Sequence, residues 1–268
     1  EARRGGEGQG PFRERPAWLC GRRPGAETGG VTHLPDPEQL VPRLVDMCRA
    51  LCRELEFETF LVGVRGRRLQ KGTPQDAFAA WKARVRREAG RTLAEEWEAR
   101  GRRPAFRCPE LLLVYDADHD LVEPTLRPVL LYGRYRKLVR DLTQTLAHWK
   151  HPDCRGQGCA GCGETGRLYP HSVEELLGAP CAPAFQASEW RLHGMGREDV
   201  DVRCLGAGRP FVLELVAPRR RRADLAALSA EVDRHGAGRV ELARPLEPAG
   251  EHVVARLKGS EARKTHRA

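Results

Sequence analysis

Apolar residues in the first half of the chain recur with two different periods. Stretches with an apolar residue at every third or fourth position predict helices, whereas short apolar runs between polar residues predict strands. Helices and strands that follow one another in this way are typical of an α+β domain, which we place at residues 35–150. The predicted elements are a helix over residues 37–56, a strand over 56–64, one long amphipathic helix or two helices from Asp76, and strands over 109–120 and 127–135.

The second half of the chain predicts a further α+β region over residues 168–268. A short helix opens at Ser172, and an amphipathic helix over residues 218–236 begins with four consecutive arginines. These arginines either form a solvated helix end or contact phosphates. Strands are predicted over residues 211–215, 240–247 and 251–259.

One short segment alternates strictly between charged residues and valine. Residues 199–203 read Asp-Val-Asp-Val-Arg, which is the period-2 pattern of a strand with one apolar face. The opposite face would carry Asp199, Asp201 and Arg203 together. A carboxylate held beside arginines keeps a low pKa and stays ionised, which suits a nucleophile or a base. A charged ladder on the solvent face of a sheet is the competing interpretation.

The composition favours a globular protein with a polyanionic partner. Of 268 residues, 40% are hydrophobic, and 46 Lys and Arg against 37 Asp and Glu give a formal net charge of +9. The first 34 residues are rich in Gly, Arg and Pro and read as a flexible arm. No apolar run is long enough to span a bilayer. We therefore expect a cytoplasmic protein that acts as a monomer without membrane contact.

The nine cysteines are scattered, which favours metal binding over a disulfide framework where they cluster. Residues 151–167 hold two pairs with a two-residue gap, His151 with Cys154 and Cys159 with Cys162. Four soft ligands of this kind predict a zinc knuckle with a structural Zn²⁺. The alternative is a set of reduced loop cysteines. Because the spacer between the pairs is short, one ligand could also come from Cys20 or Cys108.

Two other clusters have simpler interpretations than a metal site. Cys48 and Cys52 stand four residues apart on a predicted helix without a histidine or an acid nearby, so we expect core cysteines. Residues 116–120 contain three aspartates and a histidine, but the glycine and terminal glutamate of an EF-hand loop are missing. We interpret this segment as an acidic turn at a strand end.

Several segments together resemble, in the same order, the tRNA pseudouridine synthase Pus10 family, most closely its archaeal branch. The resemblance extends over most of residues 37–268. The segments that carry it are TFLVGV at 59–64, GRYRKLVRDLTQT at 133–145, CRGQGCAGCGETGR at 154–167, SVEELL at 172–177, HGMGREDVDVRCLGAGRPFVLEL at 193–215 and SEARKTHRA at 260–268.

The resemblance implies an enzyme that isomerises uridine to pseudouridine in the TΨC arm of tRNA, at one or both of two adjacent uridines. It implies a THUMP-containing RNA-binding accessory domain, the zinc knuckle, and the first half of a mixed-sheet catalytic domain that is incomplete at its C-terminus. No organic cofactor is expected. The alternative is a zinc-stabilised RNA-binding module whose catalytic half is truncated or inactive.

The resemblance also implies roles for individual residues. The aspartate of the family's Gly-Arg-x-Asp motif is the nucleophile, and it falls on Asp199. Arg197 would fill the space of the extruded nucleotide. His266 stands where the family has a tyrosine that stacks on the target base. Arg203 and Arg209 would contact phosphate or a carboxylate. For Arg219 and Arg220, in the arginine run described above, the phosphate contact is suggested by the charge and not by the resemblance.

Overall fold

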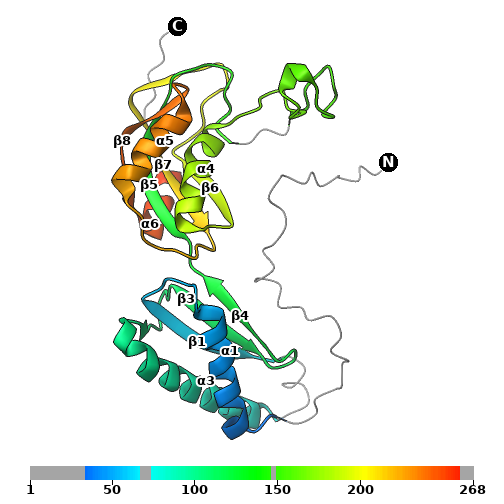
Figure 1. The fold of residues 1–268 in the computed structure, drawn as a ribbon, viewed down its shortest axis with the longest axis vertical. Helices are drawn as coiled ribbons and strands as arrows, with labels where there is room; N and C mark the ends of the chain where they lie inside the picture. Colours follow the sequence, from blue (N-terminus) through cyan, green and yellow to red (C-terminus); the bar gives the residue numbers. More distant parts are fainter. Residues whose placement is uncertain (1–33, 67–73, 146–148, 260–268) are drawn as a thin grey trace. The chain divides into compact units, whose positions relative to one another are not determined.

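A computed structural model describes residues 34–66, 74–145 and 149–259 of the chain (Figure 1). The chain divides into two compact units, Glu1–Arg127 and Pro128–Ala268. Each unit contains helices and its own four-stranded sheet, so the predicted α+β class is confirmed. No helix among these described residues is long and apolar enough to cross a membrane.

The sheet of the first unit has the strand order β2-β1-β3-β4. Strand β1 pairs in parallel with β2 and β3, and β3 pairs antiparallel with β4. A tight turn over residues 117–120 joins β3 to β4, which confirms the expected acidic strand-end turn. The bounds are Thr59–Arg65 for β1, Arg103–Pro104 for β2, Leu111–Asp116 for β3 and Leu121–Leu126 for β4.

Two long helices, α1 (Pro37–Cys52) and α3 (Gln75–Trp97), pack on this sheet (Figure 1). Asp36 caps α1 by accepting a hydrogen bond from the amide of Glu38, and a proline follows at the first helical position. A short 3-10 turn, η1 (Glu98–Arg100), ends α3. The buried row of α3 recurs every three or four residues and consists of Phe78, Trp81, Val85, Ala89, Leu93 and Trp97.

The boundary between the units corrects the predicted domain limit at residue 150. Strand β5 (Val129–Lys137), which we expected in the first domain, is a central strand of the second sheet. It pairs with β7 on one side and with β8 on the other. The apolar run of β5 was compatible with either domain, because the sequence pattern of a buried strand does not show to which sheet the strand belongs.

The second sheet has the order β6-β7-β5-β8, with every described neighbouring pair antiparallel, whereas a mixed sheet was expected. Alternate residues of β7 point to opposite faces, so Phe211 and Leu213 join one core cluster while Val212 joins another. The bounds are Glu189–Gly194 for β6, Cys204–Val216 for β7 and Val240–Pro248 for β8.

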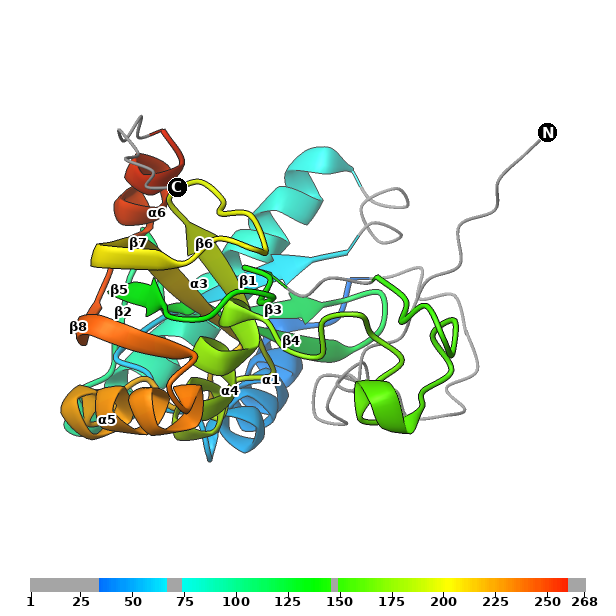
Figure 2. The same cartoon turned by 90° about the horizontal axis from the view of Figure 1, so that it is seen from above.

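Helices cover both faces of this sheet (Figure 2). Helices α4 (Val173–Phe185) and α5 (Leu225–Gly236) pack on the face that carries Phe211, and α6 (Glu251–Lys258) packs on the face that carries Val212. Ser172 caps α4 by accepting a hydrogen bond from the amide of Glu175, as its position in the sequence predicted. Each sheet face thus has its own apolar core.

Helix α6 corrects the strand predicted over residues 251–259. Val253, Val254 and Leu257 follow the helical spacing i, i+1 and i+4, and they pack against Leu130 and Val212. The two adjacent valines suggested a strand because β-branched residues favour strands. Packing against an already formed sheet face decides the outcome here.

Candidate functional site

The segment that was expected to be a charged strand is a loop between β6 and β7. Residues 197–203 have no regular structure apart from a turn at Val200 and Asp201, and Gly196 at φ +70° turns the chain after β6. The amide of Val202 donates to the carbonyl of Asp199 over 3.3 Å, which closes the turn. Asp199 and Asp201 therefore do not share a strand face, and that prediction was wrong.

Asp199 is exposed at the outer side of this loop. Within the described ranges its carboxylate makes no ion pair, so the expected contact with a neighbouring arginine is not formed there. Arg197 and Arg203 are exposed on the same loop. The loop thus carries an exposed aspartate and two exposed arginines.

Glu198, the residue before Asp199, points in the opposite direction and is buried. Its carboxylate accepts hydrogen bonds from the Tyr135 hydroxyl at 2.5 Å and from Nε2 of Gln144 at 3.1 Å. The Arg209 guanidinium completes an ion pair with it, with Nε 2.7 Å from Oε2. Burial, followed by the charge of Glu198, raises the pKa of Tyr135 well above its usual value, which keeps the hydroxyl a donor.

Lys137, the last residue of β5, forms hydrogen bonds to the backbone of this loop from the protein interior. Its side chain is completely buried, and Nζ donates to the carbonyls of Leu142, Asp199 and Val200 at 2.9, 2.9 and 2.8 Å. Burial lowers the pKa of Lys137, while the charge of Glu198 opposes this shift. The ammonium group therefore uses its three donors on backbone oxygens around the residue that carries the exposed carboxylate.

The sequence alone did not predict the buried residues that hold this loop in place. Tyr135, Lys137 and Gln144 all lie within GRYRKLVRDLTQT, a segment that carried the family resemblance but received no role. Glu198 was read as the variable residue of a Gly-Arg-x-Asp motif. The available signal was the period-2 spacing of β5, which places Lys137 on the same buried face as Leu131 and Tyr135, because a buried lysine must find hydrogen-bond partners.

Arg219 and Arg220, expected in RNA contacts, precede α5 without being part of it. The helix begins at Leu225, where Asp224 accepts hydrogen bonds from two amides at 3.0 Å. The backbone amide of Arg220 donates to the carbonyl of Phe185 at the end of α4, and the Arg220 side chain is exposed. His266 lies outside the described residues.

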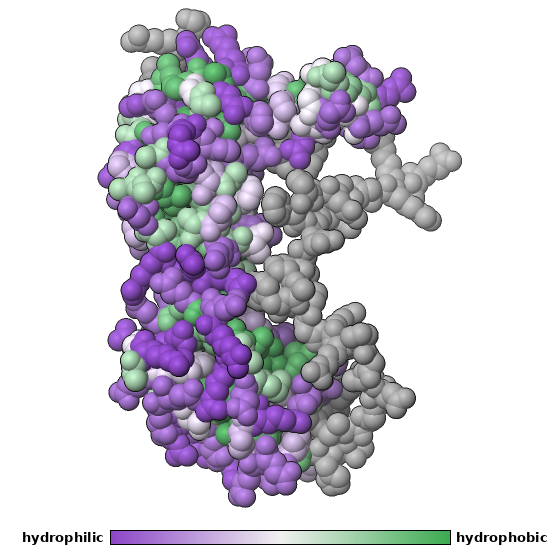
Figure 3. Space-filling view, in the orientation of Figure 1, coloured by the Kyte–Doolittle hydropathy of each residue, from purple (hydrophilic) through white to green (hydrophobic). Residues whose placement is uncertain are grey.

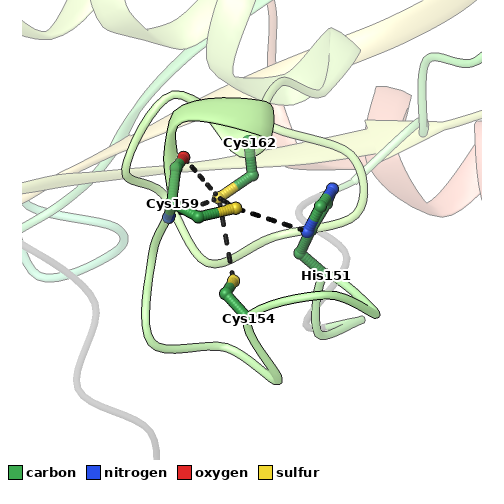
Figure 4. Close-up of side chains that lie close together, drawn as sticks. All are labelled: His151, Cys154, Cys159 and Cys162. Atoms are coloured by element: carbon green, nitrogen blue, oxygen red, sulfur yellow. Dashed lines mark hydrogen bonds between the residues drawn. The ribbon is translucent and has the colours of Figure 1, made fainter.

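The four predicted metal ligands come together in one cluster (Figure 4). Their ligand atoms all lie within 4.8 Å of one another. Sγ of Cys162 lies 3.9 Å from that of Cys154 and 3.7 Å from that of Cys159, and Cys159 Sγ lies 3.7 Å from Nδ1 of His151. A metal with bonds of about 2.3 Å to sulfur in tetrahedral geometry requires ligand separations of this size. The cluster can hold a metal ion.

Local backbone donors favour a thiolate at this cluster. The amides of Cys159 and Gly166 donate to Sγ of Cys162 at 3.3 and 3.2 Å. Although burial acts to raise the pKa of Cys162, these donors lower it to about 6. Gly166 has φ +66°, and a Cβ there would lie 2.5 Å from the carbonyl oxygen of Gly156, so a side chain would push the loop apart.

The proposal that one ligand comes from elsewhere is not needed. His151 and the three cysteines already supply four ligand atoms from one segment, which includes the 3-10 turn η2 (Ala160–Cys162). Cys108 is exposed in the first unit, and Cys20 lies outside the described residues. Cys48 and Cys52 are buried core residues as predicted, and burial raises the pKa of each to about 12.

Comparisons with known proteins agree on one family. Residues 130–268 match the family described as "Pus10, C-terminal". The tRNA pseudouridine synthase Pus10 of Methanothrix thermoacetophila is 37% identical over 236 residues, which cover 86% of this chain and 51% of the relative. The protein of that name from Methanothermobacter marburgensis is 45% identical over 161 residues, which cover 59% of this chain and 40% of the relative. The one from Archaeoglobus fulgidus is 37% identical over 216 residues, which cover 80% of this chain and 59% of the relative. The chain spans about half the length of these curated relatives.

Proposed function

The chain belongs to the Pus10 family, whose C-terminal region its residues 130–268 match, and from this membership we propose that it isomerises uridine to pseudouridine in tRNA. Its relatives carry the name of tRNA pseudouridine synthases. We place the target uridines in the TΨC arm, as the sequence resemblance implies.

The nucleophile of the proposed reaction is Asp199. The observation that carries this assignment is the contrast between two adjacent carboxylates of one loop: Glu198 is buried in an ion pair, while Asp199 is exposed and without an ion pair in the described part of the chain. A nucleophile must reach its substrate, and only Asp199 of the two can do so. Asp201 is exposed on the following turn and serves as the comparison residue.

The reaction needs no oxidant or reductant. The carboxylate attacks the sugar or the base, and the bond between the sugar and the base nitrogen breaks. The uracil turns, its carbon forms the new bond to the sugar, and the bond to the carboxylate breaks, which returns Asp199 to its ionised form. The carbon loses a proton, and the freed base nitrogen gains one. The target nucleotide must leave its stack, and Arg197 is placed on the same exposed loop to fill the vacated space. Arg203 then contacts phosphate, whereas Arg209 serves as the carboxylate partner of Glu198.

The other parts of the chain support binding of tRNA. We assign the first unit as a THUMP-like RNA-binding domain, and Arg219, Arg220 and His266 as further RNA contacts. Hydrophilic residues cover much of the visible face of the described chain (Figure 3), and the net charge of +9 suits a polyanion. The metal of the cysteine cluster is a structural Zn²⁺, which closes the segment 151–167. Such a protein acts in the cytoplasm.

Single-turnover assays of Asp199→Asn and Asp201→Asn on unmodified tRNA test the proposal, with carbodiimide mapping of the TΨC arm. Asp199→Asn should abolish pseudouridine formation and keep tRNA affinity, because affinity comes from arginines and lysines. Asp201→Asn should retain most of the rate. Full activity of Asp199→Asn would refute the assigned nucleophile. A parent protein that binds tRNA without turnover would identify the alternative, a zinc-stabilised RNA-binding module.

A further inference from the structure

Three consecutive residues of the loop between β6 and β7 are fixed from inside unit 2. The Glu198 side chain is held by three partners, and the carbonyls of Asp199 and Val200 both accept hydrogen bonds from Lys137. Only the Asp199 side chain in this stretch points to solvent without a partner among the described residues. A loop that is held in this way can present one carboxylate in one position.

Lys137 is held in place more firmly than a surface lysine. It ends β5 and pairs in register with Cys204 of β7 and with Val240 of β8, so strands on both sides fix its backbone. Its side chain is completely buried. An ammonium group in such a position is tolerated because all three of its protons have acceptors.

From this geometry we infer that Lys137 is a positioning residue that fixes the backbone of Asp199, and thereby the place of the exposed carboxylate, relative to the second sheet. The inference rests on the proposed function for its catalytic part. Lys137 is completely buried, so its side chain is not available to a substrate that binds from solvent. It acts through the main chain of the residue that does.

A purely structural role would have different consequences. If Lys137 only stabilised unit 2, its replacement would lower stability and would affect rate in proportion to the fraction unfolded. If it positions Asp199, its replacement loosens residues 195–203 and slows the chemical step in molecules that are still folded. A displacement of about 1 Å at a reacting group can cost on the order of 100-fold in rate.

The test compares Lys137→Met with Ser229→Ala in the full chain. Ser229 is a matched control because its buried hydroxyl also hydrogen-bonds the backbone of unit 2, at Leu225 and Leu246, away from the loop. Hydrogen exchange of residues 195–203, tRNA affinity, and the single-turnover rate at saturating tRNA are measured for both. Lys137→Met should raise exchange in this loop alone and lower the rate by about 100-fold with little change in affinity. Ser229→Ala should do neither.

Two conservative variants keep the inference testable if Lys137→Met does not fold. Lys137→Arg and Lys137→Gln each retain some hydrogen-bond donors. Their rates and loop exchange should fall between those of the parent and those of a protein that lacks the hydrogen bonds of Lys137. Equal loop exchange in all Lys137 variants and the parent would overturn the inference. An unchanged rate in a folded variant whose parent is active would overturn it as well.

The failure of the proposed function is distinguishable from the failure of this inference. An inactive parent would remove the proposed activity, but hydrogen exchange would still decide whether Lys137 fixes the loop. Increased exchange confined to residues 195–203 would support the positioning role, and its absence would refute that role.

Discussion

The Glu198 carboxylate and the Arg209 guanidinium form an ion pair across 2.7 Å, with only 3% and 11% of the two side chains exposed. Arg209 also donates to the carbonyl of Met195 at 2.7 Å, so one guanidinium holds both the start of the loop and its buried glutamate. Charges are rarely left this far from water without a partner, because the desolvation cost of each is large. The pair is therefore a feature whose removal should be measurable.

Arg209→Met should destabilise unit 2 by about 3–5 kcal/mol, because it leaves the Glu198 charge buried and uncompensated. The exposed pair Arg191 and Glu189 on β6 offers a matched control, in which Arg191→Met should cost less than about 1 kcal/mol. Urea unfolding of the parent and of both variants gives the loss in the free energy of unfolding for each variant. Equal losses of stability in the two variants would show that the buried charge of Glu198 is neutralised in another way, such as by protonation.

Removal of zinc should lower the melting temperature of the protein, because a structural metal contributes to the stability of the segment that it closes. Elemental analysis should give one zinc per chain. Cys162→Ser should lower the zinc content strongly, because it removes a thiolate that lies within 3.9 Å of the sulfur atoms of Cys154 and Cys159. A metal-free sample whose melting does not respond to a chelator would contradict the assignment.

The exposed Cys108 provides the control for that experiment. Cys108→Ser makes the same chemical change outside the cluster, so zinc content and the chelator response should match the parent. A loss of zinc in this variant would reopen the question of a ligand from the first unit.

Acid should destabilise the first unit through Asp116. Burial acts to raise the pKa of this carboxyl, but hydrogen bonds from His119 and Arg65 lower it below its usual value. A carboxylate with a depressed pKa contributes stability above its unfolded pKa of about 3.9, and this contribution is lost as the pH falls through the lower folded value. Asp116→Asn should therefore flatten the fall in stability between about pH 5 and about pH 3, measured by urea unfolding.

Thiol labelling should separate the cysteines by burial. Cys48, Cys52 and Cys181 are buried with pKa values near 12, so they should react only on unfolding. Cys108 is exposed and should react in the native protein within the first phase. Mass spectrometry of labelled peptides identifies each site. Rapid native labelling of Cys48 would indicate that α1 opens locally.

Local signals in the sequence were sufficient for much of the fold. Apolar spacing predicted α1 and α3, the capping residue Ser172 predicted the start of α4, and paired two-residue gaps predicted the metal cluster. These features depend on residues a few positions apart, and the local geometry of such residues is largely independent of the rest of the fold.

Features that depend on distant residues could not be predicted in this way. Residues 199–203 alternate like a strand, but the carbonyls that a sheet would use accept hydrogen bonds from Lys137, which lies 62 residues before Asp199. The valines of α6 fit a strand until a sheet face is available for them to cover. Glu198 and Asp199 have similar side chains, and only their partners in the fold give them different roles.

Strand β5 comes first in the sequence of its sheet but lies between two strands that come much later. Leu131 pairs with Leu213 on one side and with Pro248 on the other. During synthesis on the ribosome, both edges of β5 therefore stay unpaired until most of unit 2 has been made. An open strand edge is a site at which chains associate with one another, so a product that stops before β8 should aggregate through β5. The order of synthesis therefore leaves β5 in need of protection, for example by a chaperone, until β7 and β8 have been made.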